Sequence, residues 1–150
     1  MCCKFFIIPD VDKKKNEWCR HCRLGSSKPC QIYDRRPTIC RDFECGWKDG
    51  ERIFGNEWYP KRSHMVIVPG DNSLLIKVDP GIPNAWRQEP YHSQILQWSW
   101  KILVWISVGD ELFLVKRGWE QEKEYDAAKE EKTAYDDYHR RQKVEEELAA

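Results

Sequence analysis

Short apolar runs alternate with turn-forming residues through the middle of the chain. Segments 64–69 and 73–78 are rich in Val, Ile and Leu, and Gly70-Asp71-Asn72 separates them. Because Gly, Asp and Asn favour turns between strands, this pattern predicts a β-hairpin. The following segment, Asp79-Pro80-Gly81-Ile82-Pro83, should end the second strand, since neither proline can donate a hydrogen bond to a sheet.

A helix is predicted over residues 89–101. Its apolar residues Tyr91, Ile95 and Trp98 recur at intervals of four and three, which places them on one helical face. The remaining predicted strands are 102–108 and 111–115, joined by a Gly109-Asp110 turn of the kind that two-residue hairpin loops favour.

These elements predict an α+β fold in which a small antiparallel sheet is packed by one helix. We expect a single metal-binding domain over 1–119, with a loop-rich cysteine cluster in 1–47 and the sheet and helix core in 52–117. Residues 120–150 are expected to form a charged helical tail.

The expected tail contains no Gly or Pro and is rich in Glu, Lys and Ala. Its thin apolar stripe comprises Tyr125, Ala128, Tyr135 and Tyr138. Because such a stripe buries little surface, the helix should either fray or lie against a partner protein or a second copy of the chain.

The composition of the chain indicates where the protein is located in the cell and which chemistry its cysteines perform. The longest largely apolar run, 102–108, is far shorter than the ~20 residues of a membrane span, and the N-terminus lacks the features of a signal peptide. A cytoplasmic protein without a membrane partner is therefore expected. In that reducing compartment seven cysteines favour metal binding or thiol chemistry over disulfides.

All the cysteines lie in the first 45 residues: Cys2, Cys3, Cys19, Cys22, Cys30, Cys40 and Cys45. A Cys-x2-Cys turn, here Cys19 and Cys22, aims two thiolates at one ion, and a second pair from elsewhere completes a tetrahedral zinc site. Cys30 and Cys40 are expected to supply that pair ahead of Cys45, Cys3 and Cys2. Pro37 suits the start of a short helix that would present Cys40.

Zinc is the preferred metal, and the same ligands suit iron or an iron–sulfur cluster. Cationic neighbours favour the thiolate form of cysteine and offset its charge. In this region they are Arg20, His21, Arg23, Arg35, Arg36 and Arg41.

Two other function classes stay open. Trp18-Cys19-Arg20-His21-Cys22 has the Trp-Cys-x-x-Cys form of thiol oxidoreductases, but the polar residues before it do not predict the buried strand that such enzymes need. Residues 1–62 hold 14 bases and 9 acids, an excess of five, yet acids interleave with the bases, so a nucleic-acid-binding zinc module ranks third. No phosphate-binding glycine loop or Ser/His/Asp set is present, and the sequence leans against an enzyme.

The cysteine motifs resemble a known family. Cys30-Gln-Ile-Tyr-Asp-Arg-Arg-Pro-Thr-Ile-Cys40-Arg-Asp-Phe-Glu-Cys45, preceded by Trp18-Cys19-Arg-His-Cys22 and Cys2-Cys3-Lys4, is similar to the YkgJ-type cysteine-cluster family of zinc- or iron-chelating proteins. The resemblance continues through 78–87 and covers about 2–116. It implies metal chelation by the cysteines and names no substrate.

One departure from the family concerns the start of the sequence. Members carry further cysteines just upstream of the position that Cys2 and Cys3 occupy, whereas Met1 directly precedes Cys2 here. Either the start lies at an internal methionine of a longer product, or the site is a reduced version of the family's.

Overall fold

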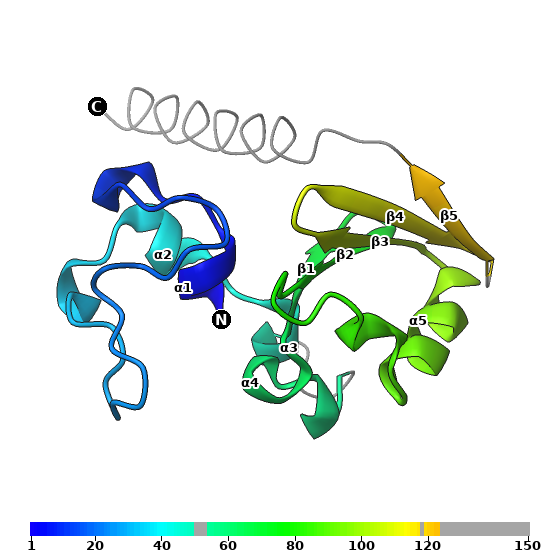
Figure 1. The fold of residues 1–150 in the computed structure, drawn as a ribbon, viewed down its shortest axis with the longest axis horizontal. Helices are drawn as coiled ribbons and strands as arrows, with labels where there is room; N and C mark the ends of the chain where they lie inside the picture. The colour runs from blue at the N-terminus through cyan, green and yellow to red at the C-terminus, as the bar shows by residue number, and fades with distance from the viewer. Residues whose placement is uncertain (50–53, 118, 124–150) are drawn as a thin grey trace.

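Five strands form one sheet in the order β1-β2-β3-β4-β5 in a computed structural model that describes residues 1–49, 54–117 and 119–123 (Figure 1). The strands are β1 (Met65–Gly70), β2 (Ser73–Val78), β3 (Leu103–Val108), β4 (Glu111–Lys116) and β5 (Trp119–Lys123).

Both predicted hairpins are confirmed. Strands β1 and β2 pair antiparallel with Gly70 opposite Ser73, and β3 and β4 pair antiparallel with Val108 opposite Glu111. In the second turn Gly109 has φ +59°, a left-handed conformation that glycine adopts without steric cost. The turn residues therefore set the register of each hairpin.

One strand pairing differs from the expected antiparallel sheet. Strands β2 and β3 are parallel, from Ser73 opposite Leu103 to Val78 opposite Val108. A parallel pair needs a long crossover, and residues 79–102 supply it through η4 (Ala85–Arg87) and α5 (Tyr91–Ser99). The α+β class is confirmed, and the sheet is mixed.

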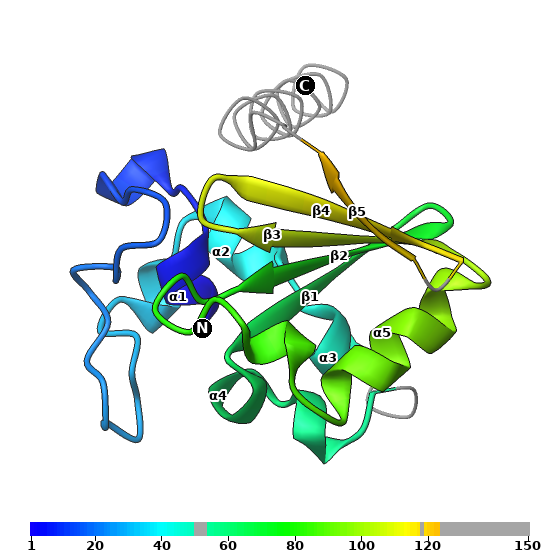
Figure 2. The same ribbon diagram turned by 45° about the vertical axis from the view of Figure 1, so that its right-hand side comes forward.

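Helix α5 covers one face of the sheet (Figure 2). The three residues predicted on its buried face do pack inward: Ile95 is fully buried, and the rings of Tyr91 and Trp98 lie 4.9 and 5.0 Å from the ring of Trp58. The main cluster of buried apolar side chains extends from Phe54 to Val115. The buried members of this core all lie outside the cysteine region, which we define as residues 1–47, and only Trp47 at the end of that region is among the partly buried side chains packed against them.

Residues 119–123 form strand β5, although a helical tail was expected from 120 onward. Trp-Glu-Gln-Glu-Lys lacks apolar alternation, so its sequence resembles a solvated segment, but β4 offers it a free edge. The rest of the expected helix, 124–150, lies outside the described residues. No helix among the described residues is long and apolar enough to cross a membrane.

Short helices and loops make up the cysteine region, which lies beside the sheet in both ribbon views (Figures 1 and 2). Its elements are α1 (Cys2–Phe5), η1 (Pro9–Val11), η2 (Tyr33–Arg35) and α2 (Thr38–Asp42). The chain then reaches the sheet through α3 (Gly46–Asp49), η3 (Asn56–Trp58) and α4 (Pro60–Ser63).

The first contact between α3 and the sheet is made by a glycine. A Cβ atom on Gly46 would lie 2.9 Å from both Cγ2 of Ile67 and Cγ of Pro69, so only glycine fits against β1 at this point. The residue directly after Cys45 therefore fixes where the cysteine region joins the core.

Candidate metal centre

The Cys-x2-Cys segment forms a tight turn. The backbone N–H of Cys22 donates to the carbonyl of Cys19 across 2.9 Å, which holds the two cysteines on one reverse turn. The segment neither follows a strand of the sheet nor opens a helix among the described residues. Its surroundings therefore differ from those of a Cys-x-x-Cys redox motif, which opens a helix after a buried strand.

Cys22 and Cys30 face each other across a small antiparallel bridge. The flanking hydrogen bonds are Arg23 N–H to Pro29 C=O, 2.8 Å, and Gln31 N–H to His21 C=O, 2.9 Å. This arrangement makes Cys22 and Cys30 a non-hydrogen-bonded pair, in which Cα atoms typically lie about 4.5 Å apart and the side chains share one face.

Cys3 joins the same group through its backbone. The N–H of Cys19 donates to the carbonyl of Cys3 across 2.9 Å, so α1 lies directly beside the Cys-x2-Cys turn. Four cysteines, the first and last of which are 27 positions apart, are thereby linked by consecutive backbone contacts. They are Cys3, Cys19, Cys22 and Cys30, which we call the cysteine quartet.

The other three cysteines lie on neighbouring elements. Cys40 is on α2, as predicted, with Pro37 as the N-cap residue, and Cys45 lies between α2 and α3. Helix α2 packs beside α1, since the Phe43 and Phe6 rings that follow these helices lie 4.7 Å apart. Cys2 is on α1, and its side chain is not among those described.

The side chains of the described cysteines are all half-buried, and no disulfide joins any two of them. In the described part of the chain, no three His, Cys, Asp or Glu side chains are arranged as a group that could hold a metal ion. The residue types and backbone placement of the quartet suit a thiolate-binding metal, whereas its side chains are not gathered around one point.

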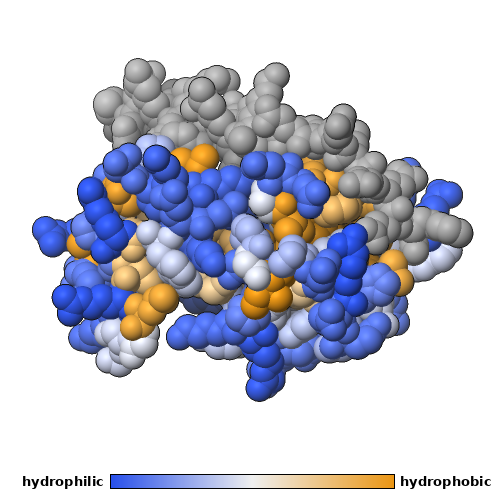
Figure 3. Space-filling view, in the orientation of Figure 1, coloured by the Kyte–Doolittle hydropathy of each residue, from blue (hydrophilic) through white to orange (hydrophobic). Residues whose placement is uncertain are grey.

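The arginines near the cysteines mostly contact their own loops. The Arg36 guanidinium stacks 3.7 Å from the centre of the Tyr33 ring and its Nε donates to the Tyr33 carbonyl. Arg41 lies within 3.4 Å of Thr38 Oγ1, and Arg20 Nε lies 3.4 Å from His21 Nε2. These cations contribute charge to a surface that Figure 3 shows to be largely hydrophilic over this region.

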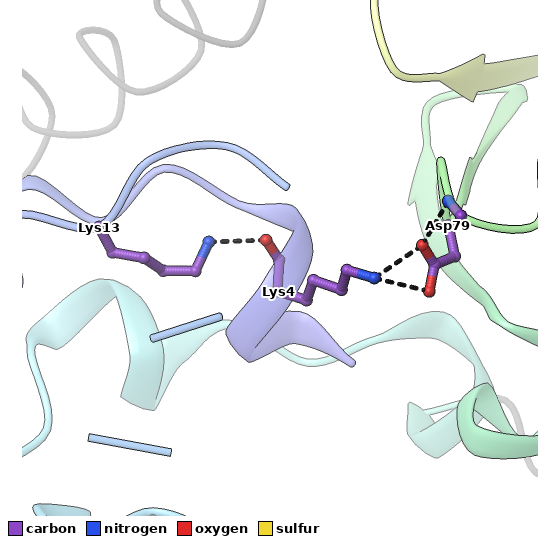
Figure 4. A network of polar contacts seen from close by, with 4 residues as sticks. Lys4, Lys13 and Asp79 are labelled. Carbon is purple, nitrogen blue, oxygen red and sulfur yellow. Dashed lines mark hydrogen bonds and ion pairs between the residues drawn. The ribbon is translucent and has the colours of Figure 1, made fainter. Parts of the chain in front are cut away.

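An ion pair between Lys4 and Asp79 connects this region to the sheet, and Lys13 holds the backbone around Lys4 (Figure 4). Lys4 Nζ contacts both carboxylate oxygens of Asp79 at 2.8 and 2.9 Å. Lys13 is buried, and its ammonium donates to the carbonyls of Lys4, Phe6 and Lys14. Lys4 is the only charged side chain among the first nine residues, which could have indicated it, but its partner lies 75 positions away and leaves no sequence signal.

Burial alone would raise the pKa of the Asp79 carboxyl. The hydrogen bonds from Lys4 Nζ and from the Gly81 N–H, together with the positive charge of Lys4, outweigh that effect and lower the pKa below its usual value. Asp79 is therefore an ionised carboxylate at neutral pH, held by a cation from the cysteine region.

Comparison with family models, with curated proteins and with solved structures gives no match for this chain.

Proposed function

We propose that this protein binds one zinc ion through the thiolates of Cys3, Cys19, Cys22 and Cys30. The observation that supports this proposal is the chain of backbone contacts that links the four residues: Cys3 to Cys19, Cys19 to Cys22, and Cys22 to Cys30. A short Cys-x2-Cys turn combined with two further cysteines is the donor set that structural zinc sites use.

The distance that zinc requires between two thiolates is compatible with the backbone at one pair of the quartet. With Zn–S bonds of about 2.3 Å, two thiolates of a tetrahedral site lie about 3.8 Å apart. A non-hydrogen-bonded pair such as Cys22 and Cys30 brings side chains this close, and a change of χ1 rotamer moves a thiolate by a few ångströms without moving the backbone. Cys22 and Cys30 could then bind one zinc ion through side-chain rotation, without a change of the backbone between them.

The local charges support a four-thiolate site. Zinc with four thiolates carries a net charge of about −2, which a polar and cationic environment offsets. Arg20, inside the Cys-x2-Cys turn, and Arg23, directly after it, are both exposed. Zinc itself would supply cross-linking of the loops, with chemistry limited to that of a structural or transported ion.

Metal analysis of serine variants tests the proposal. The purified protein should hold about one zinc per chain, and Cys→Ser at any quartet position should weaken zinc binding at least tenfold. Cys45→Ser is the matched control and should bind as the unchanged protein does. The ligand set expected from the sequence includes Cys40, whereas the quartet does not. Zinc binding by Cys40→Ser therefore distinguishes the two sets.

Retention of full affinity by Cys3→Ser, together with loss in Cys40→Ser, would contradict the quartet and restore the sequence-based ligand set. A brown protein with iron and acid-labile sulfide would replace zinc by a cluster on the same thiolates. Reduction of a disulfide substrate by metal-loaded protein would instead favour the oxidoreductase reading.

A further inference from the structure

We propose that Asp79 is a positioning residue for the metal centre, because it fixes the backbone that presents Cys3. This inference rests on the proposed function and deepens it by assigning a role to a carboxylate that lies on the sheet. It concerns the N-terminal arm, defined as residues 1–6, which carries only one member of the quartet.

The carboxylate is itself held rigidly. Asp79 directly follows β2, is 6% exposed, and its backbone N–H donates to the carbonyl of His64 across 3.0 Å. Its Oδ1 also accepts the N–H of Gly81 at 2.9 Å. Both backbone and side chain of Asp79 therefore belong to the folded core, and the carboxylate is a fixed point for the arm.

The arm reaches that point through Lys4, the residue directly after Cys3. Lys4 Nζ binds both oxygens of Asp79 and lies 5.8 Å from the centre of the Trp18 ring. Trp18 directly precedes Cys19, whose N–H binds the Cys3 carbonyl. The Cys3-Lys4 and Trp18-Cys19 dipeptides therefore run side by side, and Asp79 anchors this pair of segments to the sheet.

The arm needs such an anchor. Helix α1 has only four residues, which is too short to be stable by itself. A thiolate on a loosely held segment loses conformational freedom when it binds the metal, and fixing the segment beforehand avoids that loss. Because a buried ion pair contributes little net stability, orientation of Cys3 explains the Lys4–Asp79 contact better than stabilisation of the core does.

The test uses the full chain loaded with cobalt(II), whose thiolate charge-transfer absorption increases with the number of Co–S bonds. Variants Asp79→Asn and Lys4→Met each remove the contact from one side, Cys3→Ser removes the ligand, and Asp71→Asn is the control on an exposed aspartate in the turn between β1 and β2. Zinc affinity is measured in parallel by competition with a chelator.

We expect Asp79→Asn and Lys4→Met to bind zinc about tenfold more weakly, within the range for residues that orient metal ligands. Their cobalt spectra should lose about a quarter of the charge-transfer intensity, and the spectrum of Cys3→Ser should lose the same amount. Asp79→Glu should recover part of the affinity. The double variant Asp79→Asn/Cys3→Ser should bind no more weakly than Cys3→Ser alone, because both changes act on one ligand.

Unchanged zinc affinity and cobalt spectrum in both Asp79→Asn and Lys4→Met would overturn the inference. It would also be overturned if the loss of zinc affinity in the double variant equalled the product of the losses in the two single variants. If Asp79→Asn fails to fold, Lys4→Met still decides, since Lys4 lies nearer the surface. Failure of the underlying function is distinguishable, because the unchanged protein would then show no zinc uptake and no thiolate-to-cobalt absorption.

Discussion

At the scale of single residues, Cys22 and Cys30 are the best-defined pair in the candidate site. They lie opposite each other in a non-hydrogen-bonded bridge, whereas Cys19 and Cys22 share a turn. Directly opposite residues of this kind have the Cα separation that a disulfide requires. The two arrangements make different predictions about oxidation.

When the metal is removed and diamide is added, a Cys22–Cys30 disulfide should form first. The two thiols lose two protons and two electrons, which reduce diamide to its hydrazine. Trypsin cuts after Arg20 and Arg23, so Cys19, Cys22 and Cys30 fall on separate peptides and mass spectrometry identifies the pair. A predominant Cys19–Cys22 disulfide would contradict this geometry, and metal-loaded protein is the control, which should resist oxidation.

The buried ammonium of Lys13 leads to a prediction about the stability of the protein. Its ammonium satisfies three backbone carbonyls in a site where the residue is only 5% exposed. Lys13→Met should lower the free energy of unfolding by about 3 kcal/mol, because the carbonyls lose their donor while remaining buried. Urea denaturation measures this change. The neighbouring Lys14 is exposed, so Lys14→Met should change the stability by less than about 0.5 kcal/mol.

The sequence singles out cysteines as candidate ligands but does not fix their grouping. Cys3 ranked low because sequence spacing from Cys19 says nothing about a contact made through backbone atoms. Asp79 was assigned only to a strand end, since its pairing with Lys4 depends on how the cysteine region docks on the sheet. Contacts between distant segments carry no periodic signal.

At the scale of elements, the hairpins and the central helix were predictable because each follows a local rule. Alternating apolar runs, turn residues and a period of 3.6 identify β1 to β4 and α5 with small shifts of their ends. The parallel pairing of β2 with β3 was not predictable in this way, because it depends on α5 crossing over the sheet. Strand β5 has a polar sequence and pairs through its backbone.

Helix α5 gives a matched pair of substitutions. Trp98 packs against the rings of Phe54 and Trp58 at 5.3 and 5.0 Å, whereas Trp100 is 67% exposed. Trp98→Ala should destabilise the protein by about 3 kcal/mol through lost burial and an unfilled cavity, and Trp100→Ala by less than about 0.5 kcal/mol. Both changes in the free energy of unfolding are measured from the midpoints of urea denaturation, with the slope of that free energy against urea concentration held equal among the variants. Equal effects would contradict the orientation of α5.

At the scale of the whole molecule, the sheet core and the cysteine region depend on different interactions. The main apolar cluster runs from Phe54 to Val115, and the described residues of the cysteine region have only small buried groups, such as Phe5, Ile8 and Val11. Zinc in a four-thiolate site contributes roughly 10–16 kcal/mol of apparent binding free energy, comparable to the stability of an entire domain. The two parts should therefore respond differently to loss of metal.

Chelation should unfold the cysteine region and leave the sheet intact. Hydrogen–deuterium exchange should show lost protection in peptides from 1–45 and retained protection in 65–116, because the apolar core does not need the metal. Adding zinc back should restore protection, which controls for irreversible damage. Uniform loss of protection along the chain would show that the core depends on the metal, and no change would show that the loops do not.

X-ray absorption at the zinc edge, on protein purified without added metal, tests the central claim most directly. The claim predicts about one zinc per chain with four sulfur neighbours at about 2.3 Å and no nitrogen or oxygen in the first shell. A protein without metal, or a zinc whose first shell is mainly nitrogen and oxygen, would contradict binding by the cysteine quartet.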